Sequence, residues 1–357
     1  MRWFLGIVGF VAALAAIALG VGFFLLPARL DIVRSADLDR PPATTFALVD
    51  SLRSFADISP WAEFDPNAGF SITGPWRGAG QKMAWASTHP ALQTGGLELT
   101  AATPASRADL AVTIGDLPKA ALGIDFRPAA TGARLTWTWR QTCPSGFEGV
   151  ACRYRLAVLR KDLTTLAELG LQRWARRASE LPVVDFAGLA VTAADPAAAA
   201  DFAFNETETS LDPMQMQAGE KAALDIVRGF LSAHGMTAVG QPIVVVTQWD
   251  ETANKYGFRA GYRFQGPAPT TALQVRLGKS PTGAALTTHY RGPWTGLAQT
   301  YRQFDAFIAA YGVRPAGSPW QVYTAGGPLD PTAAVEVDLF MPIHPQPALE
   351  TAAEALP

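Results

Sequence analysis

An internal repeat in the second half of the chain limits its possible folds more than any other feature. Residues 230–246 read FLSAHGMTAVGQPIVVV and align without gaps on residues 307–323, which read FIAAYGVRPAGSPWQVY. Each copy predicts the end of a helix, a glycine stop at Gly235 or Gly312, a Gly-x-Pro turn and a β-strand. A repeated α+β unit predicts two similar halves that pack about a pseudo-twofold axis. We expect their shared groove to be the place for a ligand.

The first half of the chain has a different pattern, which predicts one curved sheet and one long helix. Apolar residues at spacings of three predict a helical face within residues 43–59. Short β-prone runs follow from Phe70 to Trp139 and predict an antiparallel meander. Residues 153–180 then show a long amphipathic pattern, with a predicted buried stripe of Leu156, Leu159, Leu163, Leu166, Leu169 and Leu171. We expect an α+β fold in which the sheet wraps this helix and leaves an apolar cavity.

The chain begins with an uncharged apolar run from Trp3 to Leu26. This run is long enough for a helix that crosses a hydrocarbon core of about 30 Å. A cleavable signal peptide has a shorter apolar stretch and an Ala-x-Ala-like site, and this run reaches Pro27 without one. We therefore expect an uncleaved membrane anchor formed by residues 3–26. The alternative is a long signal peptide that is cut near Gly20.

The side of the membrane on which the soluble part lies depends on two opposing signals. More arginines follow the apolar run than precede it, which by the positive-inside rule favours the cytoplasm. Cys143 and Cys152, the only two cysteines, bracket a short loop, as a disulfide does in an oxidising compartment. Two unpaired cysteines in a cytosolic loop are the alternative. We expect a disulfide and an extracytoplasmic, periplasmic location.

These patterns together divide the chain into five predicted segments. They are a transmembrane anchor at 1–28, a helix-grip domain at 29–181, a linker at 182–200, a duplicated βαββ domain at 201–344 and a disordered tail at 345–357.

Three motifs in the first domain carry a family resemblance. They are DISPWAEFDP at 57–66, GPWRGAGQKMAW at 74–85 and AELGLQRW at 167–174. With the opening strand and helix, they make residues 31–180 resemble the START/polyketide-cyclase-like superfamily, often called SRPBCC. The resemblance implies a helix-grip fold with a cavity of the size of a lipid or a polyketide. Most members of this superfamily bind ligands, and only some catalyse reactions.

The second domain carries another resemblance, on the paired repeat, on THYRGPWTGLAQTYRQF at 288–304 and on VEVDLFMPI at 335–343. Residues 201–343 resemble the GyrI-like effector-binding domain of multidrug-sensing regulators. The resemblance implies two βαββ halves around an aromatic-lined cleft, often with a buried glutamate that attracts cationic drugs. Many relatives have acidic residues near Gln321–Thr324, where this chain has QVYT, so a cation preference does not follow from the resemblance. No helix-turn-helix accompanies the domain, and we expect no direct control of transcription.

Composition and motifs exclude several classes of function. Charged residues make up 17% of the chain, the net charge is −2, and no basic run tracks phosphates, so nucleic acid is not an expected partner. No histidine has a partner at metal-ligand spacing, and two cysteines alone cannot close a zinc site. The chain has no HExxH motif, no phosphate-binding loop and no GxSxG elbow. We expect no metal and no cofactor.

Aromatic residues and one carboxylate are the candidate binding residues of the second domain. An aromatic cage is predicted from Tyr290, Trp294, Tyr301, Trp320 and Tyr323. Ordinary packing between the two halves is the alternative. Glu336 is the candidate carboxylate, because strand alternation places Glu336 and Asp338 on one face, which points either to the cleft or to solvent.

Tryptophans are the candidate binding residues of the first domain. The predicted cavity or its mouth would be lined by Trp61, Trp76, Trp85 and Trp137. Plain core packing is the alternative for each of them.

Since no complete catalytic motif is present, the sequence favours a binding protein. We expect a membrane-anchored protein that senses, carries or sequesters a small hydrophobic or amphipathic ligand. The alternatives are an enzyme of cyclase or hydrolase type, which would use a cleft carboxylate such as Glu336, and an envelope structural or interaction protein with closed pockets.

Overall fold

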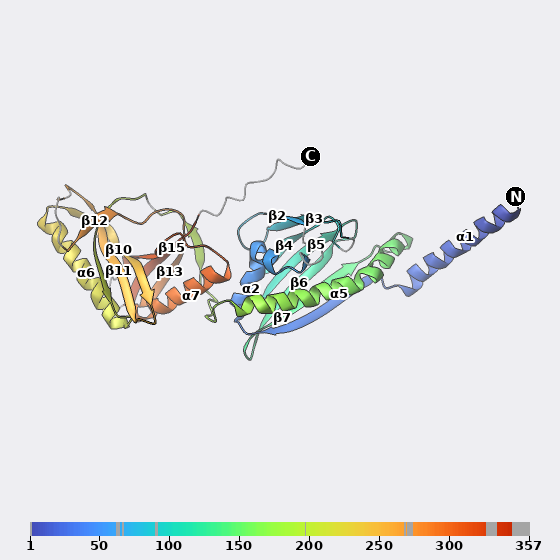
Figure 1. Ribbon diagram of the computed structural model, residues 1–357, viewed down its shortest axis with the longest axis horizontal. Coiled ribbons are helices and arrows are strands. Elements are labelled where there is room, and N and C mark those ends of the chain that lie inside the picture. Colours follow the sequence, from blue (N-terminus) through green and yellow to red (C-terminus); the bar gives the residue numbers. More distant parts are fainter. Residues whose placement is uncertain are drawn as a thin grey trace. The chain divides into compact units, whose positions relative to one another are not determined.

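The structure, a computed structural model, describes residues 2–61, 65, 68–89, 92–196, 198–267, 269, 274–325 and 334–344. It divides into two compact units, one with residues up to Ala187 and one that begins at Gly188. Each unit combines an antiparallel sheet with helices, and a long helix follows the first sheet (Figure 1). The predicted α+β class is therefore confirmed at this level. The tail expected at 345–357 lies outside the described residues.

The sheet of the first unit is a meander whose last strand pairs with the first. Its strands are β1 (Arg29–Leu38), β2 (Gly69–Thr73), β3 (Lys82–Ala86), β4 (Gly95–Thr103), β5 (Arg107–Ile114), β6 (Ala120–Ala129) and β7 (Gly132–Thr142). They lie in the order β1-β7-β6-β5-β4-β3-β2. Along β5 every second residue is buried, as expected for a sheet with one face on a core.

The buried face of this sheet packs against helices. Within the described residues, the helical elements of this part are α2 (Pro42–Asp50), α3 (Leu52–Ile58), η2 (Phe147–Gly149) and α5 (Val150–Ser179). Five of the six leucines in the predicted stripe of α5 are buried, and Leu169 is half-buried. Further along α5, Trp174 packs its ring 5.7 Å from Phe126 of β6 and donates its indole N–H to the carbonyl of Thr45. The apolar stripe thus holds α5 on the sheet.

Two helical segments precede β1. They are α1 (Arg2–Gly20) and the π-helical η1 (Val21–Leu25). Residues Gly6–Leu25 are long and apolar enough to cross a membrane, and almost all of this stretch is exposed. The same properties fit an N-terminal signal sequence, so the structure shows an apolar N-terminal helix of one of these two kinds.

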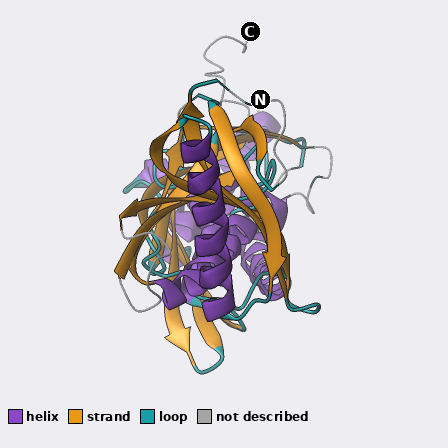
Figure 2. Ribbon diagram, turned by 90° about the vertical axis from the view of Figure 1, so that its left-hand side faces the viewer, coloured by secondary structure: helices purple, strands orange, loops and turns teal. Residues whose placement is uncertain are grey.

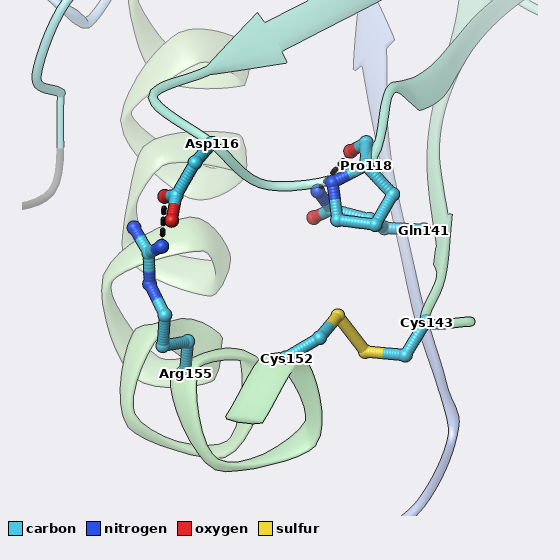
Figure 3. Close-up of a disulfide and its surroundings, with 6 residues drawn as sticks. All are labelled: Asp116, Pro118, Gln141, Cys143, Cys152 and Arg155. Carbon is cyan, nitrogen blue, oxygen red and sulfur yellow. Dashed lines mark hydrogen bonds and ion pairs between the residues drawn. A yellow bond between two sulfur atoms is a disulfide. The ribbon is translucent and has the colours of Figure 1, made fainter. Parts of the chain in front are cut away.

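A disulfide joins Cys143 to Cys152, with 5.7 Å between their Cα atoms. It links the end of β7 to the first turn of α5 (Figure 3). An ion pair between Arg155 and Asp116 ties the same part of α5 to the loop after β5. The start of α5 is therefore fixed on two sides.

The second unit has an eight-stranded antiparallel sheet within the described residues. Its strands are β8 (Val191–Ala194), β9 (Asp201–Thr209), β10 (Thr237–Asp250), β11 (Lys255–Gln265), β12 (Arg276–Lys279), β13 (Ala285–Pro293), β14 (Trp320–Ala325) and β15 (Ala334–Pro342). The helical elements are α6 (Pro213–Ala233), η3 (Trp294–Gly296) and α7 (Leu297–Ala310). Figure 2 shows α6 lying along the strands of this sheet.

The strand order reveals the duplication that the repeat predicts. The sheet runs β12-β9-β11-β10-β14-β15-β13-β8, so the two halves, β9-α6-β10-β11 and β13-α7-β14-β15, occupy mirrored places about the β10–β14 pair. Gly235 and Gly312 end the two helices with φ of 65° and 63°, the left-handed conformation that glycine adopts without strain. The junction of the halves lies at the centre of the sheet.

Two local features differ from the sequence pattern. The helix expected within 43–59 is broken at Ser51, whose backbone is extended and separates α2 from α3. Residues 191–194, which we expected in the linker, form strand β8 and pair with β13. This edge strand is short and alanine-rich, and only Val191 of its four residues is buried, so its sequence carries little β-signal.

Candidate functional site

A buried carboxylate lies at the junction of the two halves of the second unit. Glu220 of α6 is only 1% exposed. Tyr256 of β11 donates its hydroxyl to Glu220 Oε1 at 2.7 Å, and Tyr323 of β14 donates to Oε2 at 2.6 Å. Gln321 of β14 donates its amide to Oε2 at 3.1 Å. The first half thus contributes Glu220 and Tyr256, and the second half contributes the other two side chains.

The helix places Glu220 inward because the residue belongs to the apolar stripe of α6. The buried positions of this helix recur at intervals of three and four: Met216, Gln217, Glu220, Ala223, Leu224, Val227 and Leu231. The helix start is fixed by Asp212, whose side chain accepts hydrogen bonds from the amides of Met214 and Gln215. Gly219 lies against Phe258 and Thr209, where an added Cβ would be in contact at 3.4 Å. The helix backbone therefore runs close to the sheet here.

In the hydrogen-bond network around Glu220, each side chain donates toward the carboxylate, either directly or through a neighbour. Trp294 Nε1 donates to the hydroxyl of Tyr323 at 2.8 Å, and Gln321 donates to the same hydroxyl at 3.0 Å. Since that oxygen accepts both, its own proton goes to Glu220. Tyr301 likewise donates to Gln321 Oε1 at 2.9 Å, which turns the amide N–H₂ toward the carboxylate. The network is arranged for a negatively charged acceptor.

Burial and hydrogen bonding act on the pKa of Glu220 in opposite directions. Desolvation raises its pKa from 4.5 to about 7, although the bonds from Tyr323, Tyr256 and Gln321 favour the charged form and lower it. Burial, reinforced by the charge of Glu220, raises the pKa of Tyr256 and Tyr323 well above 10, so both remain hydroxyl donors. Glu220 therefore changes its charge near neutral pH.

No cation balances Glu220 within the part of the chain that the structure describes. Its polar partners there are the neutral side chains of Tyr256, Gln321 and Tyr323, and none of the ion pairs between described residues includes it. A buried carboxylate without a counter-charge costs several kcal/mol relative to one in water. Three oriented donors offset only part of that cost.

Two partly exposed aromatic rings border this cluster. Trp249 of β10 lies 5.9 Å from the ring of Tyr256, and its ring is 6.4 Å from that of Tyr301 on α7. Both Trp249 and Tyr301 are half-buried, whereas Tyr256, Trp294 and Tyr323 are buried. Trp249 and Tyr301 are therefore the more exposed members of this group of rings.

Three of the six candidate residues of this domain, Trp294, Tyr301 and Tyr323, belong to the Glu220 cluster. Trp320 is the neighbour of Gln321 and points to the opposite face of the sheet, where its ring stacks on Phe340 at 5.2 Å. Glu336 is on that second face as well and pairs with Arg291 at 3.2 Å.

Tyr290 lies outside the cluster too. Its hydroxyl donates to the carbonyl of Pro293 at 2.6 Å, and its ring lies where a Cβ on Gly292 or Gly296 would be. These two glycines leave room for the tyrosine at the start of η3.

The tryptophans proposed for the first domain lie mostly in its core. Trp61 and Trp85 are buried and stack at 4.8 Å, and Trp61 meets Phe55 edge-on at 5.8 Å. Trp137 is also buried, next to Gly170 of α5. Trp76 differs from the others, since it is half-buried in the loop before β3 and carries the guanidinium of Arg77 over its ring at 4.9 Å.

A hollow of about 290 Å³ opens on the solvent side of the first sheet. The residues that line it include Ala84, Gly96 and Thr113, which are paired across β3, β4 and β5, with Lys82 and Lys119 at its border. It lies on the face away from the buried side chain of Trp85. Among the described residues, no cluster of histidine, cysteine or carboxylate side chains could hold a metal ion.

Sequence reasoning missed Glu220, Tyr256 and Gln321. The sequence does contain a signal for Glu220, because it is the one acidic residue in register with Met216, Ala223 and Val227 on the apolar stripe of its helix. Tyr256 alternates with Phe258 and Ala260 along β11 and so shares their buried face. Which strand faces which helix residue follows only from the sheet order.

Comparison with known proteins gives matches among solved structures. No protein-family model and no curated protein matches the chain. Among solved structures, Ara h 8.0201 is 13% identical and covers 43% of this chain and 99% of its own, with a TM-score of 0.31. The C-terminal domain of EcmrR is 12% identical and covers 44% of this chain and 98% of its own, with a TM-score of 0.36.

A further match is the di-domain ARO/CYC protein StfQ from the steffimycin biosynthetic pathway, 14% identical, with a TM-score of 0.33. It covers 43% of this chain and 51% of its own. The likeness is one of fold alone.

Proposed function

We propose that this protein is a membrane-anchored receptor for amphipathic organic cations, and that Glu220 is the residue that recognises the charge. A single observation carries the proposal: a buried carboxylate at the junction of the halves, surrounded by oriented neutral donors and lacking a counter-charge among the described residues. An organic cation would supply the missing charge and would also be attracted by aromatic faces.

The ring pair Trp249 and Tyr301 is the proposed entrance. Both side chains are half-buried at the edge of the cluster, so a ligand reaches Glu220 when they change rotamer. Aliphatic or aromatic parts of the ligand would then replace ring–ring contacts with similar ones, while its charge replaces the solvation that Glu220 lacks. The ligand class is therefore a cation with a large apolar body.

The apolar N-terminal helix supports the location of this activity. As an anchor it would keep the receptor at a bilayer, where amphipathic compounds concentrate. The first unit, with its sheet closed on α5, would be a second binding module or a spacer. Its role as a helix-grip ligand domain stays a prediction.

Calorimetric titration of the detergent-purified full chain with tetraphenylphosphonium tests the proposal. We expect binding at pH 8 that weakens at least about tenfold, or about 1.4 kcal/mol, in Glu220→Gln. The matched control Glu336→Gln removes a carboxylate that already pairs with Arg291, and it should bind as the wild type does. Equal affinity of wild type and Glu220→Gln, or no binding by the wild type at millimolar ligand, would contradict the proposal.

Proton linkage gives the titration a second readout. If the cation binds only the charged form of a group with pKa about 7, the affinity should be about tenfold higher at pH 8 than at pH 6. Binding that is independent of pH in this range would exclude Glu220 as the site of charge recognition.

A further inference from the structure

The end of the apolar N-terminal stretch is packed against the start of α5. Tyr154 donates its hydroxyl to the carbonyl of Ala18 at 2.7 Å, and Arg153 donates to the carbonyl of Phe23 at 2.5 Å. The Arg153 guanidinium also lies 5.2 Å from the ring centroid of Phe23. At Gly22 the approach is so close that an added Cβ would meet Tyr154 at 2.6 Å.

These contacts fix the depth of α5 relative to any bilayer that the stretch crosses. The span-length stretch ends at Leu25, and Ala18 precedes that end by about 10 Å at 1.5 Å per residue. A tyrosine that reaches Ala18 must therefore lie at or below the level of the last turn of the span. The first turn of α5 and the disulfide loop next to it lie at the same level.

The side chains at this level have the chemistry of a membrane interface. Phe147 is 67% exposed and stacks on Phe23 at 4.9 Å, while Phe24 and Leu25 are more than 70% exposed. Aromatic rings and arginines with apolar stems are enriched where hydrocarbon meets headgroups. Farther along α5, Arg160 and Lys161 are exposed, and basic side chains near a bilayer surface are attracted to anionic headgroups.

This edge is also held rigidly. The disulfide between Cys143 and Cys152 and the ion pair between Arg155 and Asp116 fasten the first turn of α5 to the sheet (Figure 3). Cys143 donates its backbone N–H to Ala28, just after the apolar stretch. The exposed rings are thus presented by a fixed platform rather than by a free loop.

We propose that the membrane-proximal edge formed by Phe24, Leu25, Phe147 and Tyr154 inserts into the headgroup region of the bilayer, so that the first unit rests directly on the membrane. The partner is the lipid surface itself. This inference rests on the anchoring that the proposed function includes, and it adds a second lipid contact made by the folded unit.

Lipid photocrosslinking of the full chain in nanodiscs of phosphatidylethanolamine and phosphatidylglycerol tests this contact. A benzophenone amino acid replaces Phe147 in one variant and Thr131 in the control. Thr131 is an exposed turn residue between β6 and β7, at the end of the sheet opposite to the one where Arg29 pairs with Thr142. We expect a light-dependent lipid adduct at position 147 at least tenfold above that at position 131.

Whether the purified chain keeps residues 1–20 and stays in the membrane distinguishes failure of this inference from failure of the proposed anchoring. Equal or absent adducts at both positions in a chain that keeps residues 1–20 and stays in the membrane at alkaline carbonate would overturn this inference and leave the anchor intact. Loss of residues 1–20 with release from the membrane would overturn both. A benzophenone at position 147 could disturb the stack on Phe23, and Val158 then provides a second position. Val158 is 75% exposed and lies one turn beyond Tyr154 in α5. A lipid adduct at position 158 supports the proposal, and its absence overturns it.

Discussion

At the scale of single residues, the most informative side chain is Glu220, because its burial disfavours the charged form of its carboxyl group. The folded state raises its pKa from 4.5 to about 7, so between these pH values the folded protein holds a proton that the unfolded chain has released. A raised carboxyl pKa makes stability fall as pH rises through this window. Keeping Glu220 buried therefore costs stability at and above neutral pH.

Glu220→Gln should remove this pH dependence. The wild type is expected to lose about 3 kcal/mol of unfolding free energy relative to the variant between pH 4 and pH 8, since a shift of one pKa unit corresponds to about 1.4 kcal/mol. Urea unfolding in detergent across this range measures the difference. Glu336→Gln is the control, and its difference from wild type should change by less than about 1 kcal/mol because its ion pair is partly exposed. Parallel curves for wild type and Glu220→Gln would refute the raised pKa.

The two tyrosines that bind Glu220 should differ in importance. Tyr323→Phe removes one donor to Glu220 and also leaves the N–H groups of Trp294 and Gln321 without that acceptor, whereas Tyr256→Phe removes only a donor. Each unmet buried polar group costs about 1–3 kcal/mol. We expect Tyr323→Phe to be the more destabilising by at least about 1 kcal/mol in urea unfolding at pH 8. Equal losses of unfolding free energy in the two variants would show that the hydrogen bonds from Trp294 and Gln321 to Tyr323 add nothing to stability.

At the scale of elements, the duplicated halves can be compared directly through their helix stops. Gly235→Ala and Gly312→Ala both force alanine into the left-handed region, and nothing lies within 4 Å of either added Cβ. Each should therefore cost about 1–2 kcal/mol, by the same amount in the two halves. Gly229→Ala in α6 also meets no neighbour and should instead stabilise by about 0.5–1 kcal/mol. Thermal unfolding of the three variants would show whether the halves are equivalent.

Elements with a strong period could be predicted from the sequence, and the contacts between elements could not. The leucine stripe identified α5, and the repeat identified both glycine stops and the strands after them. The break at Ser51 is invisible because the apolar spacing of three continues through Leu52 and Phe55. Strand β8 is invisible because only Val191 is buried.

The candidate site shows the same division. Trp294, Tyr301 and Tyr323 were proposed from their residue type. Tyr323 donates to Glu220, and Trp294 and Tyr301 donate to Tyr323 and Gln321, which both bond to that carboxylate. That carboxylate is Glu220 and not Glu336, which shares the face of Trp320 and Phe340. A shift of the strand pairing by one residue moves every side chain of a strand to the other face of the sheet. A single sequence does not specify how β14 pairs with β15. The stripe of α6 was the available signal.

At the scale of the whole molecule, the disulfide reports on both the compartment and the stability of the first unit. Maleimide that cannot cross membranes should label no thiol in intact cells before reduction and both Cys143 and Cys152 after it. Reduction should lower the unfolding free energy by about 3 kcal/mol, because the bridge closes a loop of about ten residues. Labelling of intact cells without reduction would contradict the disulfide, and labelling only after the cells are broken would contradict an extracytoplasmic location of the soluble part.

Glu220 is proposed to bind the charge of an organic cation. Its carboxyl group can be observed directly by infrared spectroscopy. Difference infrared spectroscopy of the full chain follows the protonated C=O stretch that is present in wild type and absent from Glu220→Gln. We expect this band to titrate with a midpoint near pH 7 and to disappear at pH 6.5 when tetraphenylphosphonium is added, as the cation draws off the proton. A band that keeps its midpoint in the presence of saturating cation would contradict the account.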